Sequence, residues 1–177
     1  IQPTSSTVLK AFVFARNANL GVNRAPAGVI LLNDDARLES RYGFSSLAWT
    51  AYSREDLGVV SAAINGFVGN ENQKPFSRNP FMRQEHYKAV AFISVFISGV
   101  VWTRVGPLDE RFVQYGFDDN DYCRRVRMAG MGVGIYDGCV VEHNALSNKS
   151  TYRVKAEIGM MLEQNRKIYE EKWKVQE

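Results

Sequence analysis

The apolar run Gly28-Val29-Ile30-Leu31-Leu32, which ends in Asn33-Asp34-Asp35, is the feature that most constrains the fold. An uninterrupted apolar run bounded by polar residues is typical of a strand buried on both faces of a sheet. Leu9–Phe14 has the pattern of an earlier strand, and the Asn- and Gly-rich segment Arg16–Gly28 indicates a loop leading into a short helix. Together they predict a right-handed βαβ unit, in which ligands bind at the carboxyl ends of the strands.

Composition and charge are those of an ordinary globular domain. The 177 residues suffice for one domain with its own core, so we expect a single domain over residues 1–177. The 22 basic and 19 acidic residues are mixed along the chain without a polybasic run, so nucleic acid is not an expected partner. We expect no transmembrane segment and a cytoplasmic location, because the chain lacks a membrane-length apolar run and the pattern of a signal peptide.

The remaining elements follow from local patterns. We expect a helix over Tyr42–Tyr52, a buried strand over Gly58–Ile64, a loop or irregular hairpin over Gly66–Arg83, and one or two strands over Ala89–Trp102 with a bulge at Gly99. Further along we expect a helix beginning near Asp118, short strands over Val133–Tyr136 and Gly138–Val141, and an amphipathic helix over Thr151–Trp173.

Three carboxylates, Asp118, Asp119 and Asp121, crowd the start of the helix near Asp118. One interpretation is an acidic first turn that is favourable at a helix N-terminus and is balanced by Arg124 and Arg125. The other is a general base that reaches an acceptor hydroxyl, with a second carboxylate orienting the acceptor or the helix. Three carboxylates exceed what capping requires, which favours the second interpretation.

Asn33-Asp34-Asp35 and His143 are open to similar pairs of interpretations. The acidic pair is consistent with an Asx turn capping the next helix, or with a divalent ion held by one carboxylate while its neighbour contacts a ribose. His143, which closes an apolar run, is consistent with a packed or surface histidine, or with a metal ligand. Trp102 and Tyr115 are core aromatics or a wall for stacking a sugar. We expect the two acidic clusters and His143 to meet at one metal-assisted transfer site.

The order of these motifs, from about Ala15 to Trp173, resembles family 2 glycosyltransferases of the GT-A fold. The motifs are Asn19-x-Gly21, Ala27-Gly28-x-x-Leu31-Leu32-Asn33-Asp34-Asp35, Gly106-x-Leu108-Asp109-Glu110-x-Phe112, Phe117-Asp118-Asp119-x-Asp121-Tyr122-x-x-Arg125, Ala129-Gly130, Val140-x-x-His143 and Asn165-x-x-x-Tyr169-x-x-Lys172-Trp173. The resemblance implies an α/β fold of the GT-A, Rossmann-like type, with a mixed sheet flanked by helices.

The resemblance also implies a role for each matching residue. Asp35 and His143 would hold a Mn²⁺ or Mg²⁺ ion, and Asp119 would be the catalytic base with Asp118 beside it. The nucleotide-sugar donor would contact Asn19, Gly21, Asn33 and Asp34, and the acceptor would contact Asp121. Trp102 and Tyr115, which lie outside these motifs, are expected near the acceptor because aromatic rings stack on sugars.

The expected function is metal-dependent, inverting transfer of a sugar from a nucleotide-diphosphate donor to a glycan or other hydroxyl acceptor.

Family members usually begin with a strand, a helix and a second strand that ends in a D-x-x-S-x-D turn. The chain begins at Ile1 without that segment, so we expect it to be incomplete at its N-terminus. The alternative is a non-catalytic nucleotide-sugar or glycan-binding domain that keeps the scaffold. A nucleotidyltransferase or phosphohydrolase would need a Gly-rich phosphate loop or a second acidic metal site, and the sequence has neither.

Overall fold

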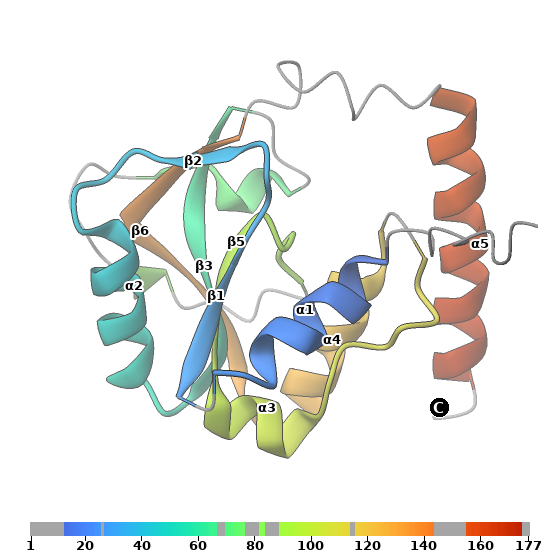
Figure 1. The fold of residues 1–177 in the computed structure, drawn as a ribbon, viewed down its shortest axis with the longest axis horizontal. Helices are drawn as coiled ribbons and strands as arrows, with labels where there is room; N and C mark the ends of the chain where they lie inside the picture. Colours follow the sequence, from blue (N-terminus) through green and yellow to red (C-terminus); the bar gives the residue numbers. More distant parts are fainter. Residues whose placement is uncertain are drawn as a thin grey trace, which may run out of the picture.

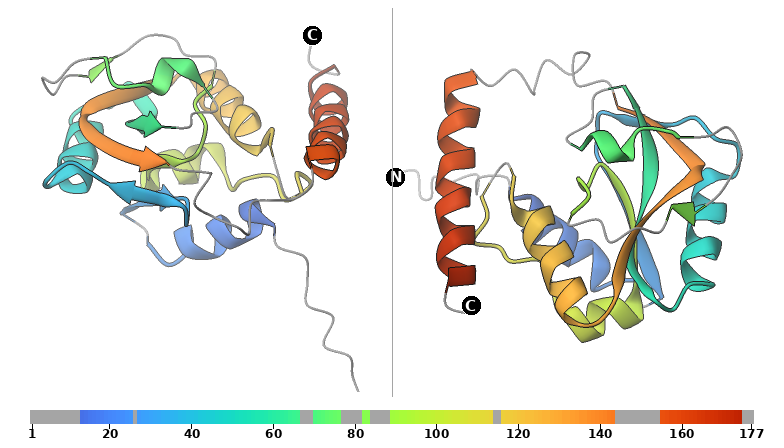
Figure 2. Two further views of the ribbon diagram at one scale, coloured as in Figure 1. Left: turned by 90° about the horizontal axis from the view of Figure 1, so that it is seen from above. Right: turned by 180° about the vertical axis from the view of Figure 1, so that it is seen from behind.

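A computed structural model describes residues 13–25, 27–66, 70–76, 82–83, 89–113, 116–143 and 155–174. This part of the chain is an α/β fold built on one mixed sheet with helices on both faces (Figures 1 and 2). The strands are β1 (Gly28–Leu32), β2 (Ala36–Leu38), β3 (Leu57–Gly66), β4 (Met82–Arg83), β5 (Ser94–Ser98) and β6 (Gly132–His143). The helices are α1 (Phe14–Val22), α2 (Gly43–Tyr52), α3 (Gly99–Val105), α4 (Asp118–Met128) and α5 (Lys155–Lys174), with a 3-10 turn, η1, at Glu71–Gln73.

The strand order is β1-β5-β3-β6-β2, and β4 pairs with β6 outside this path. Only β3 and β6 run parallel among the described pairs. Side chains from α1, α3 and α4 pack on one face of the sheet, and side chains from α2 pack on the other. Central strand β3 is buried from Leu57 to Ile64, which explains its nearly continuous apolar sequence.

Several expected elements are confirmed by the structure. The strand over Gly28–Leu32, the helix over Tyr42–Tyr52 and the strand over Gly58–Ile64 correspond to β1, α2 and β3. The terminal amphipathic helix corresponds to α5, and residues 151–154 of that prediction lie outside the described residues. In these segments the local pattern predicts the secondary structure correctly.

The predicted βαβ unit is wrong in two respects. Phe14 begins α1 instead of ending a strand, because Ala15, Ala18 and Val22 recur at helical spacing and pack into the core; residues 9–12 lie outside the described residues. The described neighbour of β1 is the antiparallel strand β5, and no strand in the described part of the chain pairs with its other side. The residues of β1 are partly exposed along its whole length, so the expectation of a strand buried on both faces is wrong.

Two other apolar segments differ from the expectation. Gly99–Trp102 is helical, because the Ser98 hydroxyl accepts a hydrogen bond from the backbone N–H of Val101 and caps α3. The two short strands expected after α4 are one strand, β6, in which residues 137–139 bulge out between the pairs Ala62–Tyr136 and Ala63–Val140. The segment predicted as a loop, Gly66–Arg83, contains η1 and β4.

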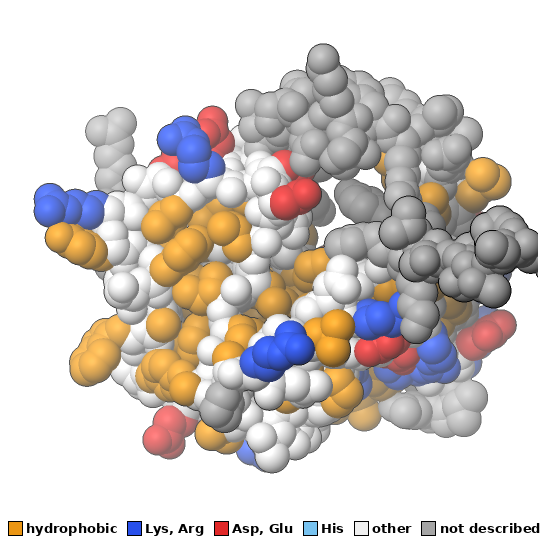
Figure 3. Space-filling model, in the orientation of Figure 1, with side chains coloured by type: hydrophobic (Ala, Val, Ile, Leu, Met, Phe, Trp, Pro, Cys, Tyr) orange, Lys and Arg blue, Asp and Glu red, His pale blue; other side chains and the backbone are white. Residues whose placement is uncertain are grey.

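Hydrophobic side chains gather over α2 and β1 on the face shown in Figure 3. Leu32, Tyr42, Trp49 and Tyr52 are the large exposed ones on these two elements and the residue preceding α2. Among the described helices, none is both long and apolar enough to cross a membrane.

Candidate functional site

The topology brings the predicted site segments to one edge of the sheet. Leu32 at the end of β1 pairs with Ser94 at the start of β5, and His143 at the end of β6 pairs with Gly66 at the end of β3. Helix α4 precedes β6 and runs back along the sheet, so its first turn faces the same edge (Figure 1). Ligands of open α/β sheets bind at such an edge.

Asp35 and His143 lie side by side at this edge although 108 residues separate them in the sequence. Asp35 Oδ1 and His143 Nε2 are 3.1 Å apart, and each side chain is only 8% exposed. The register of β2 on β6, which pairs Ala36 with His143, fixes this contact. Asp35 directly precedes Ala36, the strand partner of His143, so the Asp35 carboxylate contacts the His143 ring.

The turn Asn33-Asp34-Asp35 connects β1 to β2 and does not cap a helix. The backbone N–H of Ala36 donates to the carbonyl of Asn33 at 3.1 Å, and the N–H of Asn33 donates to the carbonyl of Ile93 at 2.9 Å. Asp34 is exposed at the tip, whereas the Asp35 side chain points inward to His143. The helix-capping interpretation of this segment is therefore wrong.

Asp35 and His143 are spaced as a hydrogen-bonded pair, and the same spacing fits two ligands of one divalent ion. Two ligand atoms at adjacent octahedral positions, each about 2.1 Å from a Mg²⁺ ion, lie about 3 Å apart, close to the observed 3.1 Å. In the described part of the chain, no third His, Cys, Asp or Glu completes a metal-binding group with them. An ion held by two protein ligands keeps positions for water and phosphate oxygens, as Mg²⁺ usually does.

The acidic segment forms the first turn of α4. Phe117 is the N-cap residue in a left-handed conformation, and Asp118 and Asp119 are the first two helical residues, so neither is the cap itself. The Asp119 carboxylate accepts a hydrogen bond from the backbone N–H of Asn120 at 2.7 Å and another from the N–H of Phe92. The loop that bears Phe92 also holds Asn33 through Ile93, so it connects the two acidic segments.

The surroundings of Asp119 favour a general base. Burial, and next the negative charge of Asp118, raise the pKa of Asp119 to about 7, although backbone N–H groups oppose the shift. Burial also raises the pKa of Asp118, with a smaller contribution from Asp121. A carboxylate with a pKa near neutrality has the balance of basicity and ionisation that proton transfer at neutral pH requires.

These pKa shifts predict that stability is greatest at mildly acidic pH. The raised pKa of Asp119 contributes stability that is complete below the ordinary value of 3.8 and is lost as pH rises to about 7. The hydrogen bond from Arg111, followed by that from Lys172, holds the pKa of Asp109 below its usual range, so stability also falls as pH drops below about 4. Urea unfolding between pH 3 and 8 measures the loss of stability at both ends of this range. The loss toward pH 8 should shrink in Asp119→Asn, where only the raised pKa of Asp118 remains; an unchanged loss there would contradict the assignment.

Asp121, expected near the acceptor, is fully buried and joins α4 to α5. Its carboxylate accepts hydrogen bonds from Arg125 Nε at 2.9 Å and Trp173 Nε1 at 3.2 Å, and it lies 2.7 Å from Lys172 Nζ. Arg124 stacks over the Trp173 ring at 4.2 Å. Both carboxylate oxygens are occupied by this network, which gives Asp121 a structural role.

Three other predicted residues lie away from the Asp35–His143 pair. The Asn19 amide is buried and bonds the backbone N–H and C=O of Leu108 as well as Glu110. Gly21 is exposed in α1, and a Cβ there would meet nothing within 4 Å. Trp102, half-buried in α3, stacks on Tyr122 with ring centroids 5.7 Å apart. Tyr115 lies outside the described residues.

Two contributors received no predicted role from the sequence, although Asn165 belongs to one of its motifs. Phe92 acts through its backbone N–H, which leaves no signal in residue type. Asn165 is buried in α5 and bonds the backbone that leads into α4. Its signal was available, because a polar residue at position 165 interrupts the apolar positions Met161, Leu162, Ile168 and Tyr169 on one helix face.

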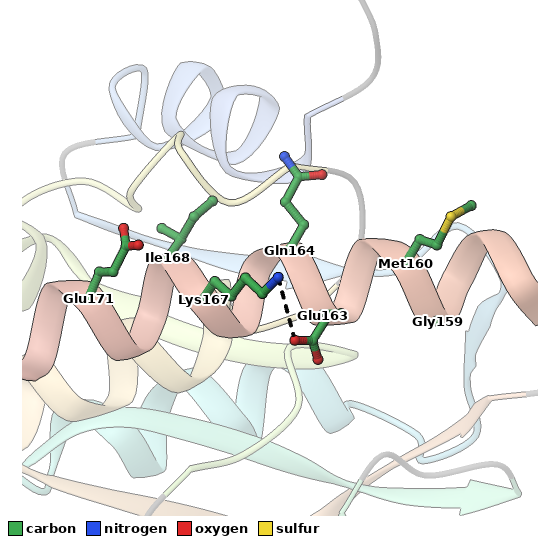
Figure 4. Close-up of a pocket in the computed structure, with 7 residues that line it drawn as sticks. All are labelled: Gly159, Met160, Glu163, Gln164, Lys167, Ile168 and Glu171. Atoms are coloured by element: carbon green, nitrogen blue, oxygen red, sulfur yellow. Dashed lines mark ion pairs between the residues drawn. The ribbon is translucent and has the colours of Figure 1, made fainter.

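A shallow open depression on α5 is separate from the acidic segments. Its lining includes Met160, Gln164, Lys167 and Ile168, and Lys167 pairs with Glu163 at 3.9 Å (Figure 4). Its described lining contains none of the residues expected at the site. The edge that bears Asp35, His143 and Asp119 is therefore the better candidate site.

Comparison of the sequence with known protein families found no matching family model, and comparison with curated proteins found no significant match. What the structure defines is an α/β protein with a mixed sheet flanked by helices and a carboxylate–histidine pair at one sheet edge.

Proposed function

We propose that the protein is a metal-dependent glycosyltransferase with the GT-A fold that moves a sugar from a nucleotide-diphosphate donor to an acceptor hydroxyl, with inversion. The observation that carries the proposal is the 3.1 Å contact between Asp35 and His143. This contact lies at the same sheet edge as the first turn of α4, which bears Asp119. A pair of metal-ligand side chains and a carboxylate with a pKa near neutrality are the two parts that such a transfer needs. The order of the sequence motifs supports the same reaction.

In this reaction Asp119 accepts the proton of the acceptor hydroxyl while the acceptor oxygen bonds to the anomeric carbon. The bond from that carbon to the diphosphate oxygen breaks, and its electron pair leaves with the nucleoside diphosphate. Attack from the face opposite the leaving group inverts the configuration in one displacement. Asp35 and His143 would hold Mn²⁺ or Mg²⁺, which when bound neutralises the charge of the departing diphosphate. Asp34, exposed beside Asp35, is available for the donor nucleotide.

Replacing His143 with Ala or Asp35 with Asn should weaken Mn²⁺ binding at least about tenfold, since even residues that only support a metal ligand cost that much. Calorimetric titration of the chain with MnCl₂, followed by UDP in the presence of Mn²⁺, measures the effect. Asp34→Asn is the matched control, because Asp34 is adjacent and exposed and should leave Mn²⁺ affinity unchanged. Equal Mn²⁺ affinity in all four proteins would contradict the metal site.

Release of UDP from UDP-glucose and UDP-galactose with Mn²⁺ tests the reaction itself. Binding of these donors with neither hydrolysis nor transfer to any acceptor would favour a non-catalytic nucleotide-sugar-binding domain.

A further inference from the structure

Asn165 of α5 binds the backbone of the segment that leads into α4, and its side chain is fully buried. Its Oδ1 accepts a hydrogen bond from the backbone N–H of Val113 at 3.2 Å, and its Nδ2 donates to the carbonyls of Val113 and Gly116, both at 2.9 Å. The amide of Asn165 therefore holds both backbone groups of Val113 and the carbonyl at the end of the segment.

The turn that Asn165 holds is conformationally demanding. Gly116 and Phe117 both have positive φ angles, +87° and +72°. The left-handed conformation costs a residue with a side chain about 1 to 2 kcal/mol, so Phe117 keeps it only because its surroundings impose it. The Phe117 ring packs on Tyr169 of α5 with centroids 5.5 Å apart, and a Cβ on Gly116 would lie 2.6 Å from Cδ2 of Leu162. Helix α5 thus braces the turn through backbone and side chain.

Asp118 and Asp119 follow this turn directly and form the first turn of α4. Two consecutive left-handed residues determine the direction in which the chain enters a helix, and hence where the first side chains point. The second attachment of α5, from Lys172 and Trp173 to Asp121, lies further along α4. The two attachments can therefore be separated by mutation.

We propose that Asn165 is a positioning residue for the Asp118–Asp119 pair, which it aims through the left-handed turn at Gly116 and Phe117. This role rests on the proposed function, in which Asp119 takes the proton of the acceptor. Asn165 acts through the backbone that it binds, and a displacement of about 1 Å at a reacting group can cost about 10²-fold in rate.

Asn165→Ala in the full chain tests the role through the carboxylates themselves. Titration followed by ¹³C NMR of the Asp carboxyl carbons gives the higher pKa of the Asp118–Asp119 pair without any substrate. We expect it to fall by about one unit or more, because burial and the proximity of the two charges both depend on a fixed first turn. Transfer should slow by about 10²-fold with little change in KM for the donor.

Three further variants distinguish a loss of positioning of Asp118 and Asp119 from a general loss of stability. Gln164→Ala changes an exposed neighbour on α5 and should alter neither pKa nor rate. Trp173→Phe removes the N–H donor to Asp121, so it should lower Tm and leave the pKa of the pair unchanged. Gly116→Ala strains the same turn while Asn165 stays intact, so it should reproduce the pKa change, and it decides the question if Asn165→Ala does not fold.

An unchanged pKa in folded Asn165→Ala or Gly116→Ala would overturn the proposal, as would an equal fall in Trp173→Phe. If the wild type transfers no sugar while Asn165→Ala still lowers the pKa, the proposed function fails and the positioning of the two carboxylates by Asn165 stands.

Discussion

Asp119→Asn should lower the rate of sugar transfer by about 10² to 10⁴-fold and, at the same time, stabilise the protein above neutral pH. Asparagine cannot take the acceptor's proton, but its side-chain oxygen can still accept the hydrogen bond from the backbone N–H of Asn120. The wild-type carboxylate is partly buried beside Asp118 and is mostly ionised at pH 8, where its burial and repulsion are unfavourable. We expect a gain of about 1 to 3 kcal/mol at pH 8, which is a few degrees in Tm.

Two measurements check this result. Transfer is followed as UDP release at saturating donor and Mn²⁺, and Tm of both proteins is measured at pH 5 and pH 8. The Tm difference should be smaller at pH 5 than at pH 8, because the stability that depends on the raised pKa of Asp119 is lost progressively between about pH 4 and pH 7. Asn120→Ala is the control on the same turn, because its side chain is exposed and its backbone N–H remains. Wild-type transfer by Asp119→Asn would show that another group is the base, and a Tm difference independent of pH would contradict the raised pKa.

The sequence predicts the parts of the fold whose local pattern matches their surroundings. β3 is apolar along its length and central in the sheet, and α2 and α5 carry helical patterns, so all three follow from short windows. α3 could not be predicted in this way, because Gly99–Trp102 is a short apolar run without a distinguishing period, and the hydroxyl of Ser98 begins the helix. The pairing of β1 with β5 alone among the described strands depends on strand order, which no local pattern contains.

The candidate site, like the fold, was predictable from the sequence only in part. The motif order put Asp35 and His143 in one metal site, and the structure brings them to 3.1 Å, but the strand register that makes the contact is a tertiary feature. Asp121 shows the opposite case. Its place among neighbouring carboxylates indicated contact with an acceptor, whereas its actual partners include Trp173, 52 residues away, which sequence proximity cannot reveal.

Asp121→Ala should destabilise the protein more than any other single change to the α4–α5 network, by about 3 to 5 kcal/mol, because removing one partner leaves buried charges uncompensated. The Asp121 side chain is 0% exposed, and those of Arg125 and Lys172 are each 18% exposed. Arg125 keeps only its hydrogen bond to the carbonyl of Val105 among its described hydrogen bonds, and Lys172 keeps Asp109. The loss should release the C-terminal half of α5 from α4.

Urea unfolding followed by tryptophan fluorescence measures this effect, since Trp173 becomes exposed when α5 detaches. Lys172→Met should cost less, because it leaves Asp121 with both Arg125 and Trp173. Glu163→Gln breaks an exposed ion pair on the same helix and should barely move the midpoint, as surface pairs contribute little. If Asp121→Ala were no more destabilising than Glu163→Gln, α5 would have to be held by Asn165 and the aromatic contacts alone, and the charge network would be a consequence of docking and not its cause.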